Sequence, residues 1–273
     1  MLRAFFFLLI LLGLLMRWPL GGASPVEGAF DLGVARYPAA AGTQQGPAAR
    51  TTRHVWRTEQ RVPLDQVGYA HGLSAGAALE ADHARLGERF GFRRGPGDRF
   101  RWNLPSSCEG REWGCIYTAI RDRGHADLVP LLDRIAEEAE ARAEEEAWTA
   151  GRLASWLLAF VQAIPYEIPR ESAFGVLPPP LVVSWARGDC DSKSLLLMEL
   201  LDRVGIDSVL LISEAHAHAM VGVAVASGVG ARDRLRYRGR DWVWAETTAE
   251  DAPLGWRHPK MRLPDDWRVV ALP

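Results

Sequence analysis

The middle of the chain carries hydrophobic patterns that are regular enough to predict helices. Leucine and isoleucine recur at helical spacing from Ala126 onwards, and a second helix is predicted over residues 153–164, where Pro165 ends it. The acidic run at 137–146 is expected to be the solvated face of the first helix, and Gly151 to separate the two helices.

A leucine-rich helical pattern covers residues 195–204, with Cys190 predicted in the first turn of the helix and Gly205 as its stop signal. The segment before it, 177–181, contains three successive prolines and is predicted to be a loop, because proline disfavours both helix interiors and sheets. Strand-like stretches follow the helix at 208–213, 217–226 and 241–247. Helices followed by an antiparallel meander predict an α+β fold.

The first 125 residues are less regular. Residues 54–62 are strand-like, residues 65–90 have the Ala and Leu spacing of a helix, and residues 91–97 are rich in helix breakers. Residues 24–50, which are rich in Ala, Gly, Pro and Gln, are predicted to be a flexible linker.

Residues 1–23 have the pattern of a signal peptide. A basic start precedes 13 apolar residues at 4–16, and the small residues at 21–23 fit a cleavage site before Ser24. This stretch is short for a membrane span, which needs about 20 residues. An uncleaved anchor is the alternative, because residues 12–20 remain fairly apolar. Either way we expect an exported protein, periplasmic or extracellular, that touches a membrane only through this leader.

Composition excludes one broad class of partner. The 273 residues are 48% hydrophobic and 24% charged, as in ordinary globular proteins, and the formal net charge is −2. Because nucleic-acid binding needs a basic surface, no nucleic-acid partner is expected. Arginines alternate with other residues over 232–240, which indicates an edge strand with one basic face or a solvated hairpin. Binding of an anionic cell-envelope polymer is a third interpretation of this segment.

The three cysteines fit an oxidising compartment. Cys108 and Cys115 are seven residues apart in a loop-like segment and are predicted to form a disulfide, with three unlinked thiols as the alternative. Their pairing leaves Cys190 as a free thiol. Cys190 opens the leucine-rich helix, where unsatisfied N–H groups and the helix dipole favour the thiolate. The flanking Asp189 and Asp191 oppose the thiolate, because nearby negative charge raises a thiol pKa.

A histidine and an acid follow Cys190 at a spacing that suits nucleophilic catalysis. His218 lies 28 residues after Cys190, and Glu246 lies 28 residues after His218. His218 would take the thiol proton and return it to a leaving group, while Glu246 would fix the tautomer and orientation of the imidazole. Strand alternation places His216 and His218 on the same face, so this pattern does not show which of the two is the base.

Four short segments read FVQAIPY at 160–166, GDCDSKSLLL at 188–197, HAMVGV at 218–223 and ETT at 246–248. In this order they resemble the transglutaminase-like cysteine protease superfamily in its exported bacterial and archaeal branch. Further matches lie at 200–207 and in PLG at 253–255, so the resemblance covers about a hundred residues.

The resemblance implies a papain-like α+β core over residues 126–273, with residues 51–125 as an N-terminal extension. It implies a Cys190, His218 and Glu246 triad, because the matching histidine is the one followed by Ala-Met-Val-Gly-Val. It also implies that Gln162 donates to the oxyanion; the alternative for this glutamine is a helix-terminal residue that holds a loop.

One departure concerns Ser192, which stands where the branch often has an acid, two residues after the cysteine.

These features predict an exported thiol enzyme that acts on amide bonds of a protein or peptide substrate and needs no cofactor. The acyl group would pass to water in a peptidase or amidase, or to an amine in a transglutaminase. We favour hydrolysis, because water is abundant and no amine-binding feature is visible. Tyr166 and Trp185 are predicted to line the substrate groove, and Asp189 and Asp191 to bind a cationic group of the substrate.

Two other interpretations remain. His216 and His218 could chelate a metal with Cys190 or Asp191, but the other two cysteines do not cluster with them, so no metal is expected. The chain could also be an inactive transglutaminase-like fold that serves as a binding or assembly module at the cell envelope. The complete set of Cys, His and Glu argues against that second interpretation.

Overall fold

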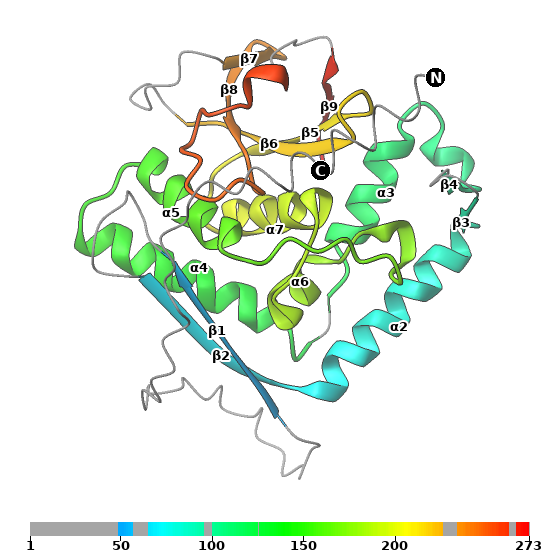
Figure 1. Ribbon diagram of the computed structural model, residues 1–273, viewed down its shortest axis with the longest axis horizontal. Coiled ribbons are helices and arrows are strands. Elements are labelled where there is room, and N and C mark those ends of the chain that lie inside the picture. The colour runs from blue at the N-terminus through cyan, green and yellow to red at the C-terminus, as the bar shows by residue number, and fades with distance from the viewer. Residues whose placement is uncertain are drawn as a thin grey trace, which may run out of the picture. The chain divides into compact units, whose positions relative to one another are not determined.

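The computed structural model describes residues 49–56, 65–95, 100–124, 126–225, 234–261 and 266–272. The chain divides into two units, residues 1–33 and 34–273, and every described residue belongs to the second. The predicted signal peptide and nearly all of the predicted linker therefore lie outside the described residues. What is described is an α+β fold, in which several helices lie beside an antiparallel sheet (Figure 1).

The main sheet has five antiparallel strands in the order β7-β8-β6-β5-β9. Their bounds are β5 (Ser208–Ser213), β6 (His218–Val223), β7 (Arg234–Tyr237), β8 (Arg240–Ala245) and β9 (Arg268–Val270). The predicted strands at 208–213, 217–226 and 241–247 correspond to β5, β6 and β8. The arginine-rich segment at 232–240 contributes β7. This is an edge strand, as the first of the interpretations given above for this segment expects. β9 has three residues, too few for an alternating pattern to show in the sequence.

Helix α7 (Cys190–Arg203) is the central helix of the fold. It contacts β5 and β6 of the sheet and four other helices (Figure 1). These are α3 (Glu112–Arg121), α4 (Val129–Glu145), α5 (Ala150–Gln162) and α6 (Pro179–Trp185). Its leucines are buried on several sides of the helix, as expected for a helix enclosed by neighbours rather than amphipathic.

The two faces of the sheet pack into separate hydrophobic clusters. Ala219 and Val221 of β6 belong to the cluster that contains Cys190 and the helix leucines. Met220 belongs to the other cluster, with Trp244 and Trp267. Strand alternation therefore places His218 at the start of β6 on the tryptophan side, while the next residue faces α7.

The N-terminal part begins with an antiparallel hairpin of β1 (Ala49–Trp56) and β2 (Asp65–Gly72). Helix α2 (Leu73–Arg89) follows directly, so the helix predicted over 65–90 was wrong for its first eight residues. Regular Ala and Leu spacing starts only at Leu73, whereas β-formers and glycines precede it. A second short hairpin joins β3 (Arg93–Arg94) to β4 (Phe100–Arg101).

Two local predictions were wrong at helix starts. The proline run was expected to exclude helix, but Pro178 is the N-cap of α6, and Pro179 begins the helix. Proline is tolerated there because N–H groups in the first turn of a helix have no acceptor within the helix, so the N–H that proline lacks costs no hydrogen bond. Gly151 does not separate helices; it lies in the first turn of α5, whose N-cap Thr149 accepts a hydrogen bond from the Arg152 N–H at 3.3 Å.

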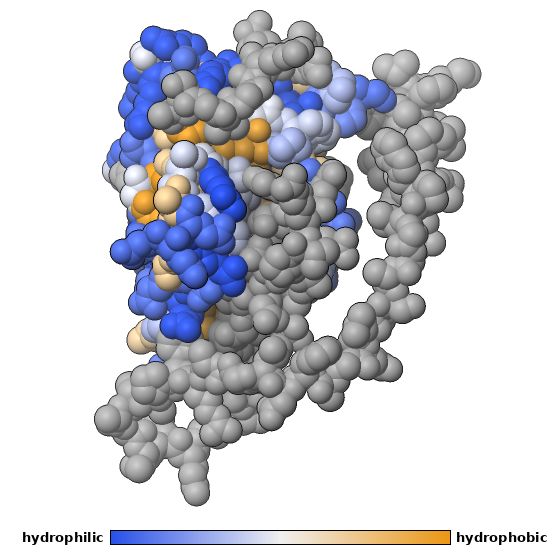
Figure 2. Space-filling model, turned by 90° about the vertical axis from the view of Figure 1, so that its left-hand side faces the viewer, coloured by the Kyte–Doolittle hydropathy of each residue, from blue (hydrophilic) through white to orange (hydrophobic). Residues whose placement is uncertain are grey.

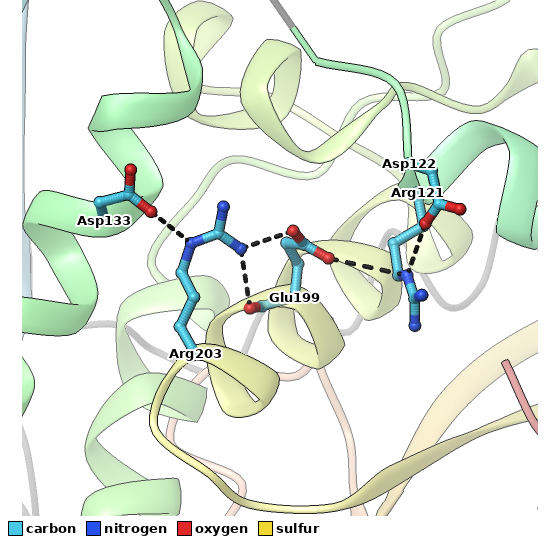
Figure 3. Close-up of polar contacts among 5 residues, drawn as sticks. All are labelled: Arg121, Asp122, Asp133, Glu199 and Arg203. Atoms are coloured by element: carbon cyan, nitrogen blue, oxygen red, sulfur yellow. Dashed lines mark hydrogen bonds and ion pairs between the residues drawn. The ribbon is translucent and has the colours of Figure 1, made fainter. Parts of the chain in front are cut away.

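A network of ion pairs fixes α3 and α4 to the end of α7 (Figure 3). Arg203 of α7 binds Asp133 of α4 at 2.9 Å and Glu199 at 2.5 Å. Glu199 lies 3.7 Å from Arg121 of α3. These side chains are only partly exposed except for Asp133, so the network is screened less than a surface pair would be.

The surface agrees with the interpretation of the acidic run. Glu137, Glu140, Glu144 and Glu145 of α4 are exposed. On the side of Figure 1 where α5 lies, the described surface is mostly hydrophilic (Figure 2). Within the described part of the chain, every helix is too short or too polar to cross a membrane.

Candidate active site

Cys190 is the first residue of α7 and is 6% exposed. Asp189 precedes it as the N-cap and accepts hydrogen bonds from the backbone N–H and the hydroxyl of Ser192, at 3.0 and 2.5 Å. The thiol donates to Asp191 Oδ2 at 3.5 Å and lies against the backbone N–H of Ala219. The sulfur therefore reaches the peptide that follows His218, at the start of β6.

Burial is the largest influence on the pKa of this thiol, and two neighbouring carboxylates add to it. Burial raises the pKa of Cys190 well above its ordinary value, and Asp191 and Asp189 raise it further, while the Ala219 N–H acts in the opposite direction. Burial, with a contribution from Asp191, also raises the pKa of Asp189 to about 7. The buried Tyr117 of α3 donates its hydroxyl proton to Asp191. In this arrangement the helix dipole is outweighed and the thiol is neutral.

His218 and Glu246 form the closest candidate pair, with His218 Nε2 2.7 Å from Glu246 Oε2. Glu246 lies just after β8, and its other oxygen accepts from the Thr248 N–H at 2.8 Å and the Thr248 hydroxyl at 2.6 Å. Burial acts to raise the pKa of Glu246, but the hydrogen bonds from His218 and Thr248 outweigh it and hold that pKa below its usual range. Glu246 is therefore ionised and can only accept, so Nε2 carries a proton.

The remaining imidazole nitrogen, Nδ1, is the one left for Cys190. It makes no hydrogen bond to any described residue, and the thiol points to Asp191 instead. The structure thus joins His218 to Glu246 and brings Cys190 to the neighbouring peptide. It does not close the hydrogen bond between thiol and imidazole.

Trp267 is a site residue that the sequence did not reveal. Its ring meets the His218 ring edge-on at 6.2 Å, packs on Trp244 at 5.4 Å, and is 7% exposed. Its indole N–H donates to the Met261 carbonyl at 3.1 Å. An apolar ring beside the His218–Glu246 pair limits water there and strengthens its electrostatic interaction. One tryptophan among eleven, next to a three-residue strand, gave no signal of this role.

Gln162 does not occupy the oxyanion position expected of it. Its amide nitrogen donates to the carbonyls of Glu246 and Ala252, at 2.8 and 2.9 Å, and the side chain is buried. An amide has two N–H donors, and both are used. Gln162 is a helix-terminal residue that holds the loop after β8, which is the alternative named above.

Lys193 is a second residue that sequence reasoning missed. It is 1% exposed, and its ammonium donates to the carbonyls of Gln162 and Ile164, at 3.2 and 2.7 Å. Burial lowers its pKa to about 8, against the favourable charges of Glu246 and Glu250. A lysine in a leucine-rich helix was the available clue. Its contacts indicate that it satisfies the last carbonyl of α5 and one just beyond the helix, and so positions the end of α5 against α7.

The structure separates the two aromatic residues predicted to line the groove. Tyr166 is 54% exposed and pairs with Gly188, and burial of its hydroxyl, followed by the charges of Cys190 and Asp189, raises its pKa. It therefore lies beside the thiol. Trp185 instead packs next to Gly76 of α2, with the Arg187 guanidinium 5.1 Å above its ring. Neither Trp185 nor Tyr166 lines the cavity described below, so the prediction that they line the groove is not supported.

His216 lies at the edge of the site and is held differently from His218. Its Nε2 is 3.1 Å from Asp266, and its ring lies 6.0 Å from Trp267. Among the described residues, the group of side chains spaced like metal ligands is Asp189, Cys190 and Asp191, and it contains neither histidine. The chelating interpretation of the two histidines therefore finds no support.

The disulfide between Cys108 and Cys115 is confirmed, with a Cα–Cα distance of 5.8 Å, and Cys190 is free. The bridge ties the start of α3 to the preceding 3-10 turn, Ser106–Cys108. Because α3 carries Tyr117, the bridge also supports the contact with Asp191.

A cavity of about 320 Å³ opens beside the site. His218, Asp189, Asp191 and Tyr117 form the wall nearest the thiol. The other walls are mostly aromatic and aliphatic. We call this cavity the aromatic cleft; its most apolar residues are Phe92, Phe100, Trp102, Trp113, Ile168 and Phe174.

Comparisons with known proteins give little further information. No protein-family model and no curated protein matches the chain. A solved structure from Parabacteroides distasonis, described as a "putative protease", is similar at 12% identity and a TM-score of 0.26. The similarity covers 75% of this chain and 43% of that one, and at this TM-score it assigns neither fold nor activity.

Asparagine in place of Asp191 is expected to make Cys190 more reactive. The amide of Asp191→Asn keeps the shape and can still accept from Tyr117, but it removes a negative charge that raises the thiol pKa. Below that pKa the thiolate fraction grows tenfold for each unit by which the pKa falls. We expect alkylation by iodoacetamide at pH 7 to become about tenfold faster, with the pH profile displaced to lower pH. An unchanged or slower rate would contradict the assignment; Asp241→Asn, on β8, is the control.

Proposed function

We propose that the chain is a cysteine-dependent acyl-transfer enzyme that acts on amide bonds of peptides or proteins. Cys190 is the nucleophile, His218 the base and then the acid, and Glu246 the residue that orients the imidazole. The observation that carries the proposal is the 2.7 Å contact between His218 and the buried Glu246, beside the residue whose N–H contacts the thiol.

The reaction would begin with rotation of the thiol from Asp191 towards His218 Nδ1. The imidazole takes the thiol proton, the sulfur attacks the carbonyl carbon, and negative charge develops on the carbonyl oxygen. The backbone N–H of Cys190, in the first turn of α7, is the available donor to that oxygen, since Gln162 is engaged elsewhere.

Collapse of the tetrahedral intermediate breaks the C–N bond, and His218 gives its proton to the departing amine. The acyl group is then bonded to sulfur as a thioester. We propose that water is the acceptor: His218 removes a proton from the attacking water, the C–S bond breaks, and the proton returns to the thiolate. The alternative acceptor, an amine, would yield a new amide.

The architecture supports the proposal at the level of fold. A cysteine at the start of a buried helix, packed against an antiparallel sheet that supplies the histidine, is the arrangement expected of a papain-like core. The disulfide between Cys108 and Cys115 supports export, because such bridges persist in oxidising compartments.

The test is to alkylate the purified protein with iodoacetamide near neutral pH and locate the label by mass spectrometry, with Cys190→Ala as the control. Turnover is measured in parallel on peptide, glutamine–amine and peptidoglycan substrates. We expect the native chain, and not Cys190→Ala, to turn over the active substrate class. Cys190 should be labelled more slowly than a free cysteine thiol, because it is buried and its pKa is raised. Turnover of no substrate, or turnover that Cys190→Ala retains, would overturn the proposal.

One observation favours a second candidate, a binding or assembly module without catalysis. The thiol is buried, its pKa is raised, and it donates to Asp191 rather than to His218. A module of this kind would bind the same peptides with Cys190 unlabelled and no product formed, so the experiment above distinguishes the two.

A further inference from the structure

The aromatic cleft is built around the residues of the candidate active site. His218 and the two aspartates beside Cys190 are part of its wall. Tyr117 belongs to both, since it lines the cleft and donates to Asp191. A group bound in the cleft would therefore hold an adjoining peptide bond close to the thiol.

Aromatic rings line the cleft in two groups. Phe92 stacks on Phe100 at 5.5 Å and lies 4.7 Å from Phe174. In the second group, Trp113 stacks on Tyr117 at 6.0 Å. Apart from Phe174, these rings come from residues 51–125, the N-terminal extension that the family resemblance does not cover.

The lining is open to solvent at its rim. Phe100 is 39% exposed and Ile168 is 45% exposed, two of the large apolar residues that the described surface leaves uncovered. Apolar surface of this kind is stabilised when another apolar group covers it.

The charges around the cleft have both signs. Arg94 and Arg170 also line it, and they are opposed by Glu214 and by the two aspartates of the site. With charges of both signs, the cleft has no strong preference for a positively or negatively charged substrate side chain. Burial among aromatic rings instead favours an uncharged side chain. The volume of about 320 Å³ lies at the small end of the range for ligand pockets, roughly 300–1,000 Å³.

We infer that the aromatic cleft is the specificity pocket of the enzyme and takes a large apolar side chain, such as phenylalanine or leucine, next to the attacked amide. That the cleft sets the specificity of a reaction rests on the proposed function. Binding of an apolar side chain in the cleft does not require that reaction to occur. The substrate class is therefore a peptide with an aromatic or branched aliphatic residue at the cleavage point.

Binding is measured on the full chain carrying Cys190→Ala, so that no reaction occurs. The ligands are N-acetylated tripeptide amides Ala-X-Ala, with X as Phe, Leu, Gly, Asp or Lys, titrated by ligand-observed NMR. The Phe and Leu peptides are expected to bind about ten- to a hundredfold more tightly than the Gly peptide, from burial of the side chain. Equal affinities, or tighter binding of the Asp or Lys peptide, would overturn the inference.

The pocket itself is tested by Phe100→Ala combined with Ile168→Ala, two exposed positions where truncation is least harmful to folding. The ratio of Phe to Gly affinity is expected to fall at least fivefold, on the basis of the apolar area removed. Leu235→Ala, at a half-buried apolar residue of β7 outside the cleft, is the matched control. A preference that survives the double substitution would place the binding site elsewhere.

A peptide with benzoyl-phenylalanine at X adds a readout that needs no variant of the cleft. Its photo-crosslinks should map to α3, to residues 168–176, or to Phe92, Phe100 or Trp102. Crosslinks confined to residues outside the cleft would overturn the inference. The outcome is separable from that of the proposed function: absence of turnover would end the catalytic proposal, yet selective binding in the cleft would still hold.

Discussion

Glutamine in place of His218 is expected to lower turnover of an amide substrate by a factor of about 10² to 10⁴, the usual contribution of a positioned general base. At neutral pH a glutamine amide cannot take the proton of the thiol. Its NH₂ group could still donate a hydrogen bond to Glu246. The raised pKa of Cys190 makes the loss larger, because a neutral thiol depends on the imidazole for its deprotonation. The measurement is kcat/KM, together with the rate of Cys190 alkylation at pH 7.

His216→Gln is the matched control for this experiment. It makes the same chemical change two residues away, at a histidine held by Asp266 at 3.1 Å and not by Glu246. We expect its kcat/KM to stay within about threefold of the wild-type value, as for a residue outside the reacting groups. If the two variants lost activity equally, or if only His216→Gln did, the assignment of the base would be wrong.

The choice between these two histidines shows what the sequence could supply. Strand alternation places both histidines on the same face of the strand, so only the family resemblance favoured His218. The structure distinguishes them by their partners, Glu246 and Asp266, which come from different segments after β6. Such long-range pairings depend on sheet order, which a local pattern does not contain.

The elements that carry the site were predictable where their hydrophobic patterns are long. The strand at 208–213 was predicted with its observed bounds, and the end of α7 within one residue, because the apolar runs and the stop at Gly205 are unambiguous. The start of α7 was predicted only as a first turn that contains Cys190. The helix start at Pro179 was missed because a proline run looks the same before a loop and in a first turn.

The roles of individual polar side chains were less predictable. Gln162 has the position that the resemblance required of an oxyanion donor, but its amide is committed to two carbonyls brought near by the loop after β8. Trp267 gave no signal, and Lys193 only that of a lysine in a leucine-rich helix, because their roles arise from burial and from residues distant in sequence. The aromatic cleft combines several separate segments, so no single stretch of sequence announces it.

Glutamine in place of Glu246 is expected to lower kcat by about 10⁴, the loss known when the orienting acid of a catalytic triad becomes an amide. The reason is the tautomer. In the native site both oxygens of Glu246 accept, one from Thr248 and the other from His218 Nε2. The amide introduced by Glu246→Gln would keep its oxygen towards the two Thr248 donors and turn its NH₂ group to the imidazole. His218 Nε2 must then accept, so the proton moves to Nδ1, where it blocks transfer from the thiol.

This shift of the proton can be observed apart from activity. ¹⁵N NMR of the labelled histidine should show the Nε2–H form of His218 in the native protein and the Nδ1–H form in Glu246→Gln. Thr248→Val is the control, because it removes the 2.6 Å hydroxyl bond and leaves the carboxylate charge and the tautomer in place. We expect that variant to lose no more than about tenfold in kcat, because the carboxylate keeps the Thr248 N–H and His218 as donors. An unchanged tautomer in Glu246→Gln, or equal losses in the two variants, would mean that Glu246 supports the loop and does not orient the base.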